Sequence, residues 1–312
     1  MEQGTFLSAD KKTDICYYFF ENVKGSPKAV VQISHGMQDY ILRYGDLIEF
    51  LNQNGFIVCG VDNLGHGATS KSSETDGFFA HKNGYKIVVS DLYTMSKLAK
   101  NKYPTLPYIM LGHSLGSFFA RYFAYLYPNV LDGLILCGTS GKVKGTGFGI
   151  ALLSLIKFFK GEKSHCQLAE NIMLKKYFKY IDNVVTKREW VTSDVQKLKK
   201  YQYDPRSTFR FTASAYQDML KVLKFVNTKK WASGIKKDLP IFICSGALDP
   251  VGNYGKGVAS VYNLLEKQKI KSIKLNLYQN ARHELHNEIP QITKQYFNDV
   301  KAWLNYILNQ NT

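Results

Sequence analysis

The sequence predicts an α/β fold in which helices cover both faces of a mostly parallel, doubly wound sheet. Two patterns in the 312 residues support this prediction. Short, nearly continuous apolar runs are typical of strands buried on both faces. Longer segments with helical spacing separate these runs, as the crossover helices of a parallel sheet do. The predicted core strands are 29–34, 56–62, 108–112, 133–137, 241–245 and 272–278.

The other core elements follow from turn signals and helical spacing. Segments 5–7 and 14–21 are predicted to form an antiparallel hairpin at one edge, which makes eight strands. Helices are predicted at 44–54, 85–102, 114–127 and 291–308. The first three end beside Gly55, Pro104 and Pro128, residues that commonly terminate helices.

The alternation is interrupted between residues 141 and 230, where the sequence contains no convincing buried strand. We therefore expect a helical insertion, 141–230, in an α/β core formed by 1–140 and 231–312. An insertion between two strands of one sheet commonly covers the ligand site, so this one is expected to form a cap or lid. Four helices are predicted within it, at 148–160, 168–180, 187–199 and 214–226.

The chain is basic, with 41 Lys and Arg against 25 Asp and Glu and a formal charge of +16. Only six of these cations are arginine, the residue that contacts phosphate and guanine with two parallel hydrogen bonds. A nucleic-acid partner is therefore not expected. The excess reflects either an AT-rich genome or attraction to an anionic membrane surface.

The expected location is cytoplasmic, with any membrane contact peripheral and at the inner face. The first residues contain neither a basic nor an apolar leader segment, and no apolar run reaches the ~18 residues of a spanning helix. The five cysteines are an odd number. Cys59, Cys137 and Cys244 lie in strand-like apolar runs, where a thiol behaves as a small hydrophobic group.

A nucleophile motif follows strand 108–112. Residues 112–116 read Gly-His-Ser-Leu-Gly, which has the form G-x-S-x-G between a predicted strand and a predicted helix. In this context the serine occupies a strained turn with its hydroxyl exposed. Gly112 and Gly116 are required because neighbouring backbone passes too close for a β-carbon. Ser114 is the predicted nucleophile, and the alternative is a tight turn whose serine has no catalytic role.

Two backbone amides are expected to stabilise an oxyanion. The N–H of Leu115 lies at a helix N-terminus beside the nucleophile. The second predicted donor is the N–H of Met37, in the loop after the first core strand, where Gly36 allows close approach. His35 and His113 are expected to shape these two turns.

The nucleophile needs a base, and the expected chain order is serine, acid, histidine. Of the histidines that follow Ser114, His165 falls in the insertion. His283 comes directly after the last strand, at the carboxyl edge where ligands bind, and is the predicted base. His286 is expected to be a supporting or surface residue. The two are three residues apart, whereas the zinc pattern H-E-x-x-H needs four, so neither metal nor cofactor is expected.

Asp249 is the predicted acid of the triad. It follows strand 241–245, and Pro250 fixes its loop. The loop 138–141 after the preceding strand contains no carboxylate, and Asp238 lies at the opposite edge of the sheet.

These motifs in this order resemble those of α/β-hydrolases of the monoacylglycerol lipase and bacterial lysophospholipase branch, related to serine aminopeptidases. The resembling residues are His35-Gly36-Met37, Arg43-Tyr44, Asp62-x-x-Gly65-His66-Gly67, Gly112-His113-Ser114-x-Gly116, Gly246-x-x-Asp249 and Arg282-His283-Glu284. The resemblance implies an α/β-hydrolase fold, a helical cap between the sixth and seventh core strands, and ester hydrolysis on monoacyl lipids. Ser117 departs from the pattern, since many members have glycine there.

The expected activity is serine carboxylic-ester hydrolysis through an acyl-enzyme, on monoacylglycerol, lysophospholipid or another small acyl ester. Two alternatives remain. A serine aminopeptidase or amidase would need an acidic group for the substrate amine, for which Glu162, Glu170 and Glu189 are candidates. A non-catalytic lipid-binding relative would bind the same lipids without turnover. The sequence does not predict an oligomeric state.

The predicted helix 148–160 is apolar except for a narrow stripe formed by Ser154, Lys157 and Lys160. It is expected either to line an acyl pocket and contact an anionic membrane peripherally, with its lysines at lipid phosphate, or to be buried against the core.

Overall fold

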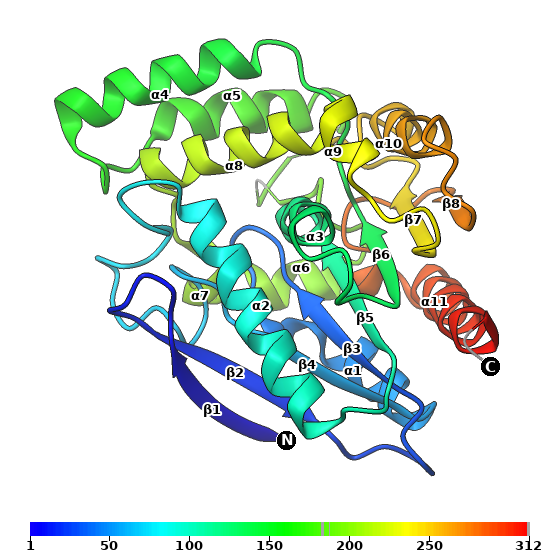
Figure 1. Ribbon diagram of the computed structural model, residues 1–312. Coiled ribbons are helices and arrows are strands. Elements are labelled where there is room, and N and C mark those ends of the chain that lie inside the picture. The colour runs from blue at the N-terminus through cyan, green and yellow to red at the C-terminus, as the bar shows by residue number, and fades with distance from the viewer. Residues whose placement is uncertain (182–183, 187, 311–312) are drawn as a thin grey trace.

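A mixed eight-stranded sheet forms the centre of the computed structural model, which describes residues 1–181, 184–186 and 188–310 (Figure 1). The strand order is β1-β2-β4-β3-β5-β6-β7-β8. β1 pairs with β2, and β2 with β4, in antiparallel fashion, and the other neighbours are parallel. The strands are β1 (Glu2–Leu7), β2 (Asp14–Phe20), β3 (Ala29–Ser34), β4 (Phe56–Val61), β5 (Tyr108–His113), β6 (Gly133–Cys137), β7 (Ile241–Gly246) and β8 (Ile273–Tyr278). The predicted eight-stranded, mostly parallel sheet is confirmed.

Strands β3 to β7 are buried along their whole length because helices cover both faces of the sheet. Helices α2 and α3 lie over one face and α1 and α11 over the other (Figure 1). These helices are α1 (Gly45–Gln53), α2 (Gly84–Lys102), α3 (Leu115–Leu126) and α11 (Pro290–Gln310), each close to its predicted range. The sequence prediction has no counterpart of α10 (Lys256–Glu266), although Val258, Val261 and Leu265 have helical spacing and are buried.

Between β6 and β7 the chain forms a separate set of helices. They are α4 (Thr146–Lys160), α5 (Gln167–Tyr177), α6 (Val195–Gln202), α7 (Pro205–Thr208), α8 (Ala213–Val226) and α9 (Lys229–Ser233). Figure 1 shows α4, α5 and α8 as a layer above the end of the sheet to which the central strands point. The carboxyl ends of the parallel strands therefore lie beneath this layer.

The helix predicted at 187–199 begins later than expected. Asp194 accepts hydrogen bonds from the backbone N–H groups two and three residues further on, at 2.8 and 3.0 Å, and caps α6 at its start. Residues 188–194 form an irregular segment, and Lys187 lies outside the described residues. Polar side chains of this segment contact the loop after β8 instead of forming a helix. The hydroxyl of Thr192, for example, donates to the carbonyl of Asn287 at 2.7 Å.

A buried arginine joins both ends of the inserted helices to α3. Arg121 donates to the carbonyl of Ser140, just after β6, at 3.0 Å. It also donates to the side chain of Asn227 at 3.1 Å and to the carbonyl of Val226, where α8 ends. Its guanidinium lies 4.4 Å from the ring centroid of Trp231, and burial lowers the pKa of Arg121 to about 9. One side chain thus fixes the start and the end of the insertion to the same core helix.

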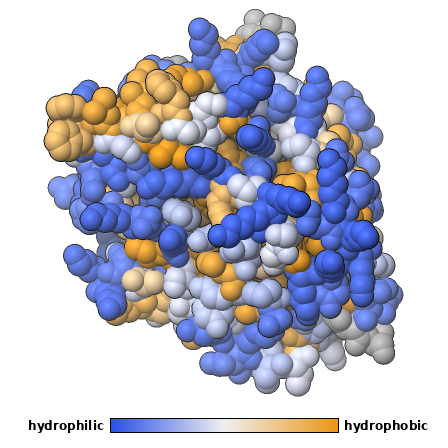
Figure 2. Space-filling view, turned by 45° about the horizontal axis from the view of Figure 1, so that its top comes forward, coloured by the Kyte–Doolittle hydropathy of each residue, from blue (hydrophilic) through white to orange (hydrophobic). Residues whose placement is uncertain are grey.

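The polar stripe of helix α4 was expected to face outward, but part of it faces the protein interior. Lys157 turns inward and donates to the side chains of Ser214 and Gln217 on α8, at 3.3 and 3.4 Å. The apolar side chains Phe148, Leu155, Phe158 and Phe159 face outward and are 55 to 81 % exposed. Figure 2 shows hydrophobic surface gathered at the upper left, over the end of α4. One face of this helix is therefore exposed, while Leu153 on its other face is buried in the core. Within the described ranges, no helix has the length and apolar character needed to cross a bilayer.

Candidate active site

Ser114 lies in a strained turn between β5 and α3. Its φ of 53° and ψ of −123° fall in a region that side-chain-bearing residues rarely adopt. A β-carbon on Gly116 would overlap the carbonyl oxygen of Ser34, and one on Gly112 would lie 2.7 Å from the carbonyl oxygen of Gly116. The close passage of backbone therefore requires both glycines. The turn leaves Ser114 partly exposed on the wall of a cavity.

Asp249 and His283 contact each other beyond the ends of β7 and β8. Nδ1 of His283 lies 3.0 Å from Oδ2 of Asp249, and both residues are buried. Burial opposes the charged form of His283, but the charge and hydrogen bond of Asp249 outweigh it and raise the pKa of His283 above its usual value. Nε2 of His283 is buried without a hydrogen-bond partner in the described chain. Ser114 lines the same cavity as His283, although the described residues include no hydrogen bond between them.

The carboxylate of Asp249 has two further donors. The hydroxyl of Ser245 donates to Oδ2, the oxygen that faces His283, at 2.9 Å. The backbone N–H of Val251 donates to Oδ1 at 2.8 Å. Ser245 was not predicted from the sequence, where its only signal is its position at the end of a strand leading to the acid. These donors hold both oxygens of Asp249 in fixed directions.

Glycines provide the space that the histidine and the serine need. Gly138 has a φ of 59°, and a β-carbon on it would lie 2.9 Å from Cε1 of His283. A β-carbon on Gly36 would lie 3.2 Å from Cβ of Ser114. Gly36 thus lets the loop after β3 approach the serine.

The two residues whose amides are expected to bind an oxyanion both line the cavity. Met37 and Leu115 line the cavity together with Ser114. In the part of the chain that the structure describes, no carbonyl or side chain accepts a hydrogen bond from either N–H. Both groups therefore remain available to a ligand oxygen.

His35 links the loops that follow β3 and β4. Its Nε2 accepts a hydrogen bond from the backbone N–H of Asn63 at 2.9 Å, so the proton lies on Nδ1, which donates to the carbonyl of Gly36 at 2.9 Å. The ring also packs against His66, with centroids 5.1 Å apart. His35 is fully buried, and both of its nitrogens are engaged in shaping the turn.

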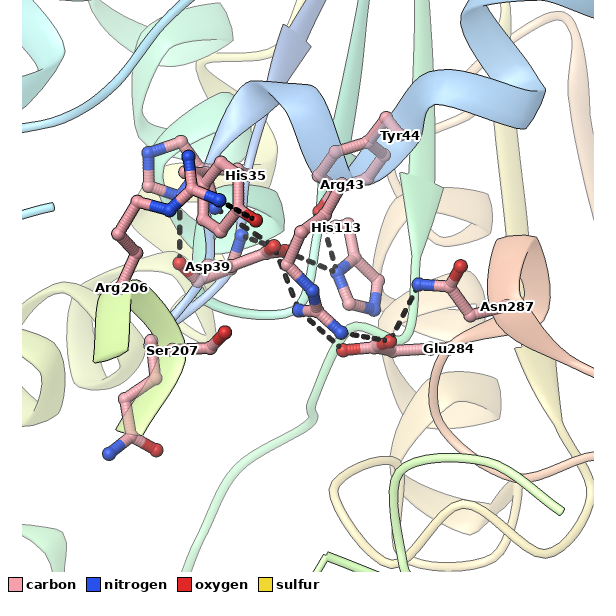
Figure 3. A network of polar contacts seen from close by, with 12 residues as sticks. His35, Asp39, Arg43, Tyr44, His113, Arg206, Ser207, Glu284 and Asn287 are labelled. Carbon is pink, nitrogen blue, oxygen red and sulfur yellow. Dashed lines mark hydrogen bonds and ion pairs between the residues drawn. The ribbon is translucent and has the colours of Figure 1, made fainter. Parts of the chain in front are cut away.

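A buried ion-pair network contributes to the lining of the cavity (Figure 3). Arg43 donates to Asp39 at 2.9 Å and to both carboxylate oxygens of Glu284 at 3.1 and 2.8 Å. Burial opposes ionisation of these carboxyls, but the charge of Arg43 dominates and holds the pKa of Asp39 well below its usual range. The pKa of Glu284 is lowered for the same reason. Asn287 adds a further hydrogen bond to Glu284 at 2.8 Å.

The network reaches the nucleophile turn through Tyr44. The hydroxyl of Tyr44 donates to Asp39 at 2.6 Å and lies 2.9 Å from Nδ1 of His113 (Figure 3). The ring of His113 lies 4.9 Å from that of His283, and its Nε2 lies 3.4 Å from the carbonyl of His283. His113 therefore supports the neighbouring histidine as well as the turn that contains it. Asp39 is not among the residues predicted from the sequence, where its only signal is its position four residues before Arg43.

The cavity beside Ser114 has a volume of about 260 Å³ and two chemically different walls. Helices α4, α5 and α8 contribute apolar side chains, among them Leu153, Ile172, Met173 and Leu223. The polar wall comes from the loop after β3, the segment 188–191 and the residues after β8.

The acidic residues considered for amine binding are not on this wall. Glu162 pairs with His81, Glu170 binds Arg210 at 3.2 Å, and Glu189 accepts a hydrogen bond from Thr186 at 2.9 Å. Of the described carboxylates, Asp39 and Glu284 line the cavity, and both are paired with Arg43.

The sheet, its crossover helices and the strand–serine–helix turn define an α/β-hydrolase. Residues 25–290 match the family model described as "Serine aminopeptidase, S33", and the chain belongs to this family. Since similarity extends over almost the whole chain to known lipases and esterases, the protein is a serine hydrolase.

Individual relatives cover most of the chain. Monoglyceride lipase of Rattus norvegicus is 24 % identical over 303 residues, which are 96 % of this chain and 89 % of the relative. The monoglyceride lipase homolog of Monkeypox virus is 25 % identical over 279 residues, which are 89 % of this chain and 90 % of the relative. The crystal structure of a thermostable carboxyl esterase from Bacillus coagulans, in complex with glycerol, is 29 % identical, covers 98 % of each chain and has a TM-score of 0.92.

Proposed function

We propose that the protein hydrolyses carboxylic esters of monoacyl lipids, with monoacylglycerol and lysophospholipid as candidate substrates. The observation that supports this most directly is the 3.0 Å contact between His283 and Asp249 beside a cavity that Ser114 also lines. The relatives named monoglyceride lipase and carboxyl esterase support the same class of substrate.

In the proposed mechanism, Ser114 attacks the ester carbonyl while Nε2 of His283 takes the hydroxyl proton. Asp249 holds the imidazole in orientation and stabilises its charged form. The N–H groups of Met37 and Leu115 stabilise the tetrahedral oxyanion. His283 then gives its proton to the leaving alcohol, and a water molecule, activated by the same histidine, releases the fatty acid from Ser114.

The two walls of the cavity suggest how a monoacyl lipid is oriented. We place the acyl chain along the apolar side chains of α4, α5 and α8 and the alcohol part beside the polar wall. In this arrangement residues 141–230 act as a cap over the core formed by 1–140 and 231–312. The fixation of both ends of the insertion by Arg121 is consistent with a distinct unit.

A panel of p-nitrophenyl esters of increasing acyl length, run beside monoacylglycerol and lysophosphatidylcholine, tests the proposal. We expect hydrolysis of long acyl esters and covalent labelling by a fluorophosphonate. Ser114→Ala should abolish labelling and lower kcat by about 10⁴ or more, with the fold intact. Ser233→Ala, at an exposed serine of α9, is the matched control. Equal labelling of Ser114→Ala and wild type would refute the assignment of the nucleophile.

An amidase or aminopeptidase activity is the second candidate, because the family takes its description from such enzymes. Both carboxylates on the described cavity wall are paired with Arg43, which leaves no free acid to bind a substrate amine. We therefore expect the esters to be hydrolysed and proline naphthylamide to be left intact. Faster hydrolysis of the amide would reverse this assignment.

We also propose peripheral membrane contact through α4. Phe158 and Phe159 are 81 and 74 % exposed, and side chains of this kind enter the boundary between lipid headgroups and acyl chains. Lys157, expected from the sequence to meet lipid phosphate, instead contacts α8. The proposed contact therefore depends on apolar insertion more than on charge.

A further inference from the structure

The polar wall of the cavity contains an arginine that has no carboxylate partner among the described residues. Arg188 lines the cavity with Ser114 and His283. No carboxylate of the described residues forms an ion pair with its guanidinium. Among the described residues, none therefore directly neutralises this positive charge on the cavity wall.

The guanidinium is held in place and still has free donors. One of its nitrogens, Nη2, donates to the carbonyl of Ser207. The backbone N–H of Arg188 is fixed by the side chains of Thr186 and Glu189, both at 3.1 Å. A guanidinium has five N–H donors, and within the described chain only one of them forms a hydrogen bond. None of its nitrogens is among the fully buried atoms of the described chain that lack a partner, so the donors that do not bind Ser207 keep some exposed surface.

The described carboxylates on the cavity wall do not neutralise this arginine directly. Asp39 and Glu284 are engaged by Arg43, by Tyr44 and by Asn287. Burial, followed by the positive charge of Arg43, lowers the pKa of Arg188. Both effects work against the positive charge, so an anion bound beside Arg188 would stabilise it.

A second unused donor lies two residues further along the same segment. Nε1 of Trp190 is buried and has no hydrogen-bond partner in the described chain. Its ring lies 5.2 Å from the ring of His283, and Trp190 also lines the cavity. A buried donor without a partner is costly, and a ligand oxygen would remove this cost.

We propose that Arg188 and Trp190 form a subsite for an anionic oxygen-bearing group, a phosphate, on the alcohol part of the substrate. This inference rests on the proposed function and narrows it, because a monoacyl glycerol phosphate is then preferred over a neutral monoacylglycerol. The planar guanidinium can donate two parallel hydrogen bonds to two oxygens of one phosphate. A ligand amine or a single ligand hydroxyl does not offer two such acceptors. The indole N–H provides a third contact on the side of His283.

The test compares two soluble esters that differ in the phosphate alone, hexanoyl glycerol 3-phosphate and hexanoyl glycerol, both below their micelle concentrations. Arg188→Gln should lower kcat/KM for the phosphate ester by about tenfold or more beyond any effect on the neutral ester. Arg188→Lys should restore part of the preference. Lys175→Gln removes one exposed cation from α5, outside the cavity wall, and should change the ratio less than about twofold.

A binding measurement separates this inference from the proposed function, because it needs no turnover. Calorimetry should detect glycerol 3-phosphate bound to wild type and to Ser114→Ala, with at least about tenfold weaker binding by Arg188→Gln. Inorganic phosphate bound as tightly as glycerol 3-phosphate would identify a free-ion site and overturn the head-group assignment. If Arg188→Gln lowered kcat/KM equally for both esters and left the binding of glycerol 3-phosphate unchanged, Arg188 would serve only to hold Ser207. Absence of all ester hydrolysis would refute the proposed function instead.

Discussion

Arg43 binds both carboxylate oxygens of Glu284, at 3.1 and 2.8 Å, and the two residues are 241 positions apart in the chain. Glu284 directly follows His283, and Arg43 lies six residues after Met37 in the chain that follows β3. The pair therefore fixes the predicted base relative to a predicted oxyanion donor. Because it is buried, this contact is protected from salt.

Replacing Arg43 should destabilise the protein strongly. Arg43→Gln leaves the carboxylates of Asp39 and Glu284 buried without their counter-charge, and we expect the free energy of unfolding to fall by about 3–5 kcal/mol. Urea denaturation measures this change. Arg206→Gln breaks the half-exposed pair with Asp204 and should cost less than about 1 kcal/mol. If the two variants lowered the free energy of unfolding equally, the buried pair would contribute no more to stability than the half-exposed one.

The pH dependence of ester hydrolysis should report the contact between Asp249 and His283. The base acts in its neutral form, so kcat/KM should fall as the pH drops through the pKa of His283, which Asp249 holds above 6.5. Asp249→Asn removes the charge that raises this pKa, and the midpoint should move to lower pH while kcat falls by about 10⁴. An Asp249→Asn enzyme with nearly full activity would mean that another residue is the acid.

Ser245 should tune the same titration with a smaller effect. Its hydroxyl donates to the oxygen of Asp249 that faces His283, so Ser245→Ala makes that oxygen a stronger acceptor for the histidine. We expect the midpoint of kcat/KM to move to higher pH and kcat to fall by less than about tenfold. A pH profile identical to that of wild type would assign Ser245 a purely structural role.

Asp91 should make stability depend on pH near neutrality. Its carboxyl lies buried between α2 and the β1–β2 turn, where Ser8 and the N–H of Ala9 donate to it, both at 2.7 Å. Burial raises the pKa of Asp91 from 3.8 to about 7. The folded state therefore binds this proton more tightly than the unfolded chain does. The resulting stability is fully present below about pH 4 and is lost as the pH rises through 7.

Asp91→Asn should remove this dependence. The free energy of unfolding of the variant, relative to that of wild type, should be higher at pH 8 than at pH 5, as measured by urea unfolding at both values. Asp10→Asn provides a contrast without a pH response in this range, because the bonds from Thr13 outweigh partial burial and lower the pKa of Asp10, so this group is ionised at both values in the folded and the unfolded state. If both variants respond equally to pH, the assignment to Asp91 is wrong.

Membrane contact should depend on the two phenylalanines at the end of α4. Replacing Phe158 and Phe159 by serine should weaken binding to vesicles by about tenfold or more, because each ring buries apolar area in the lipid boundary. Tyr203→Ser, at an aromatic side chain that is 81 % exposed elsewhere, is the control. Binding of wild type should persist at high salt. Binding that disappears with salt would point to the lysines instead.

Local signals in the sequence were sufficient to predict the sheet and the serine turn. Strand burial, the two glycines around Ser114 and the positions of Asp249 and His283 after their strands all follow from patterns of a few residues. Whether these three residues act as a triad remains a prediction that the variants above test.

Contacts between distant segments were beyond local patterns. The contribution of Trp190 depends on a segment 188–194 that is shaped by bonds to the loop after β8, whereas its own spacing resembled a helix. Likewise, Glu284 acquires its role only when folding places Arg43 beside it. Ser245 depends in the same way on the loop that returns Asp249 toward the end of its strand.

Arg121 has a consequence for protein engineering. A single side chain of α3 binds the carbonyl where the insertion starts and the carbonyl where α8 ends, so one residue fixes how both ends meet the core. We expect that insertions of other lengths and shapes can be grafted between these two attachment points, provided that the arginine and the ring of Trp231 remain and that contacts such as that of Thr192 with Asn287 are replaced. Substrate range could thus be changed by module exchange while the hydrolytic machinery beneath it stays the same.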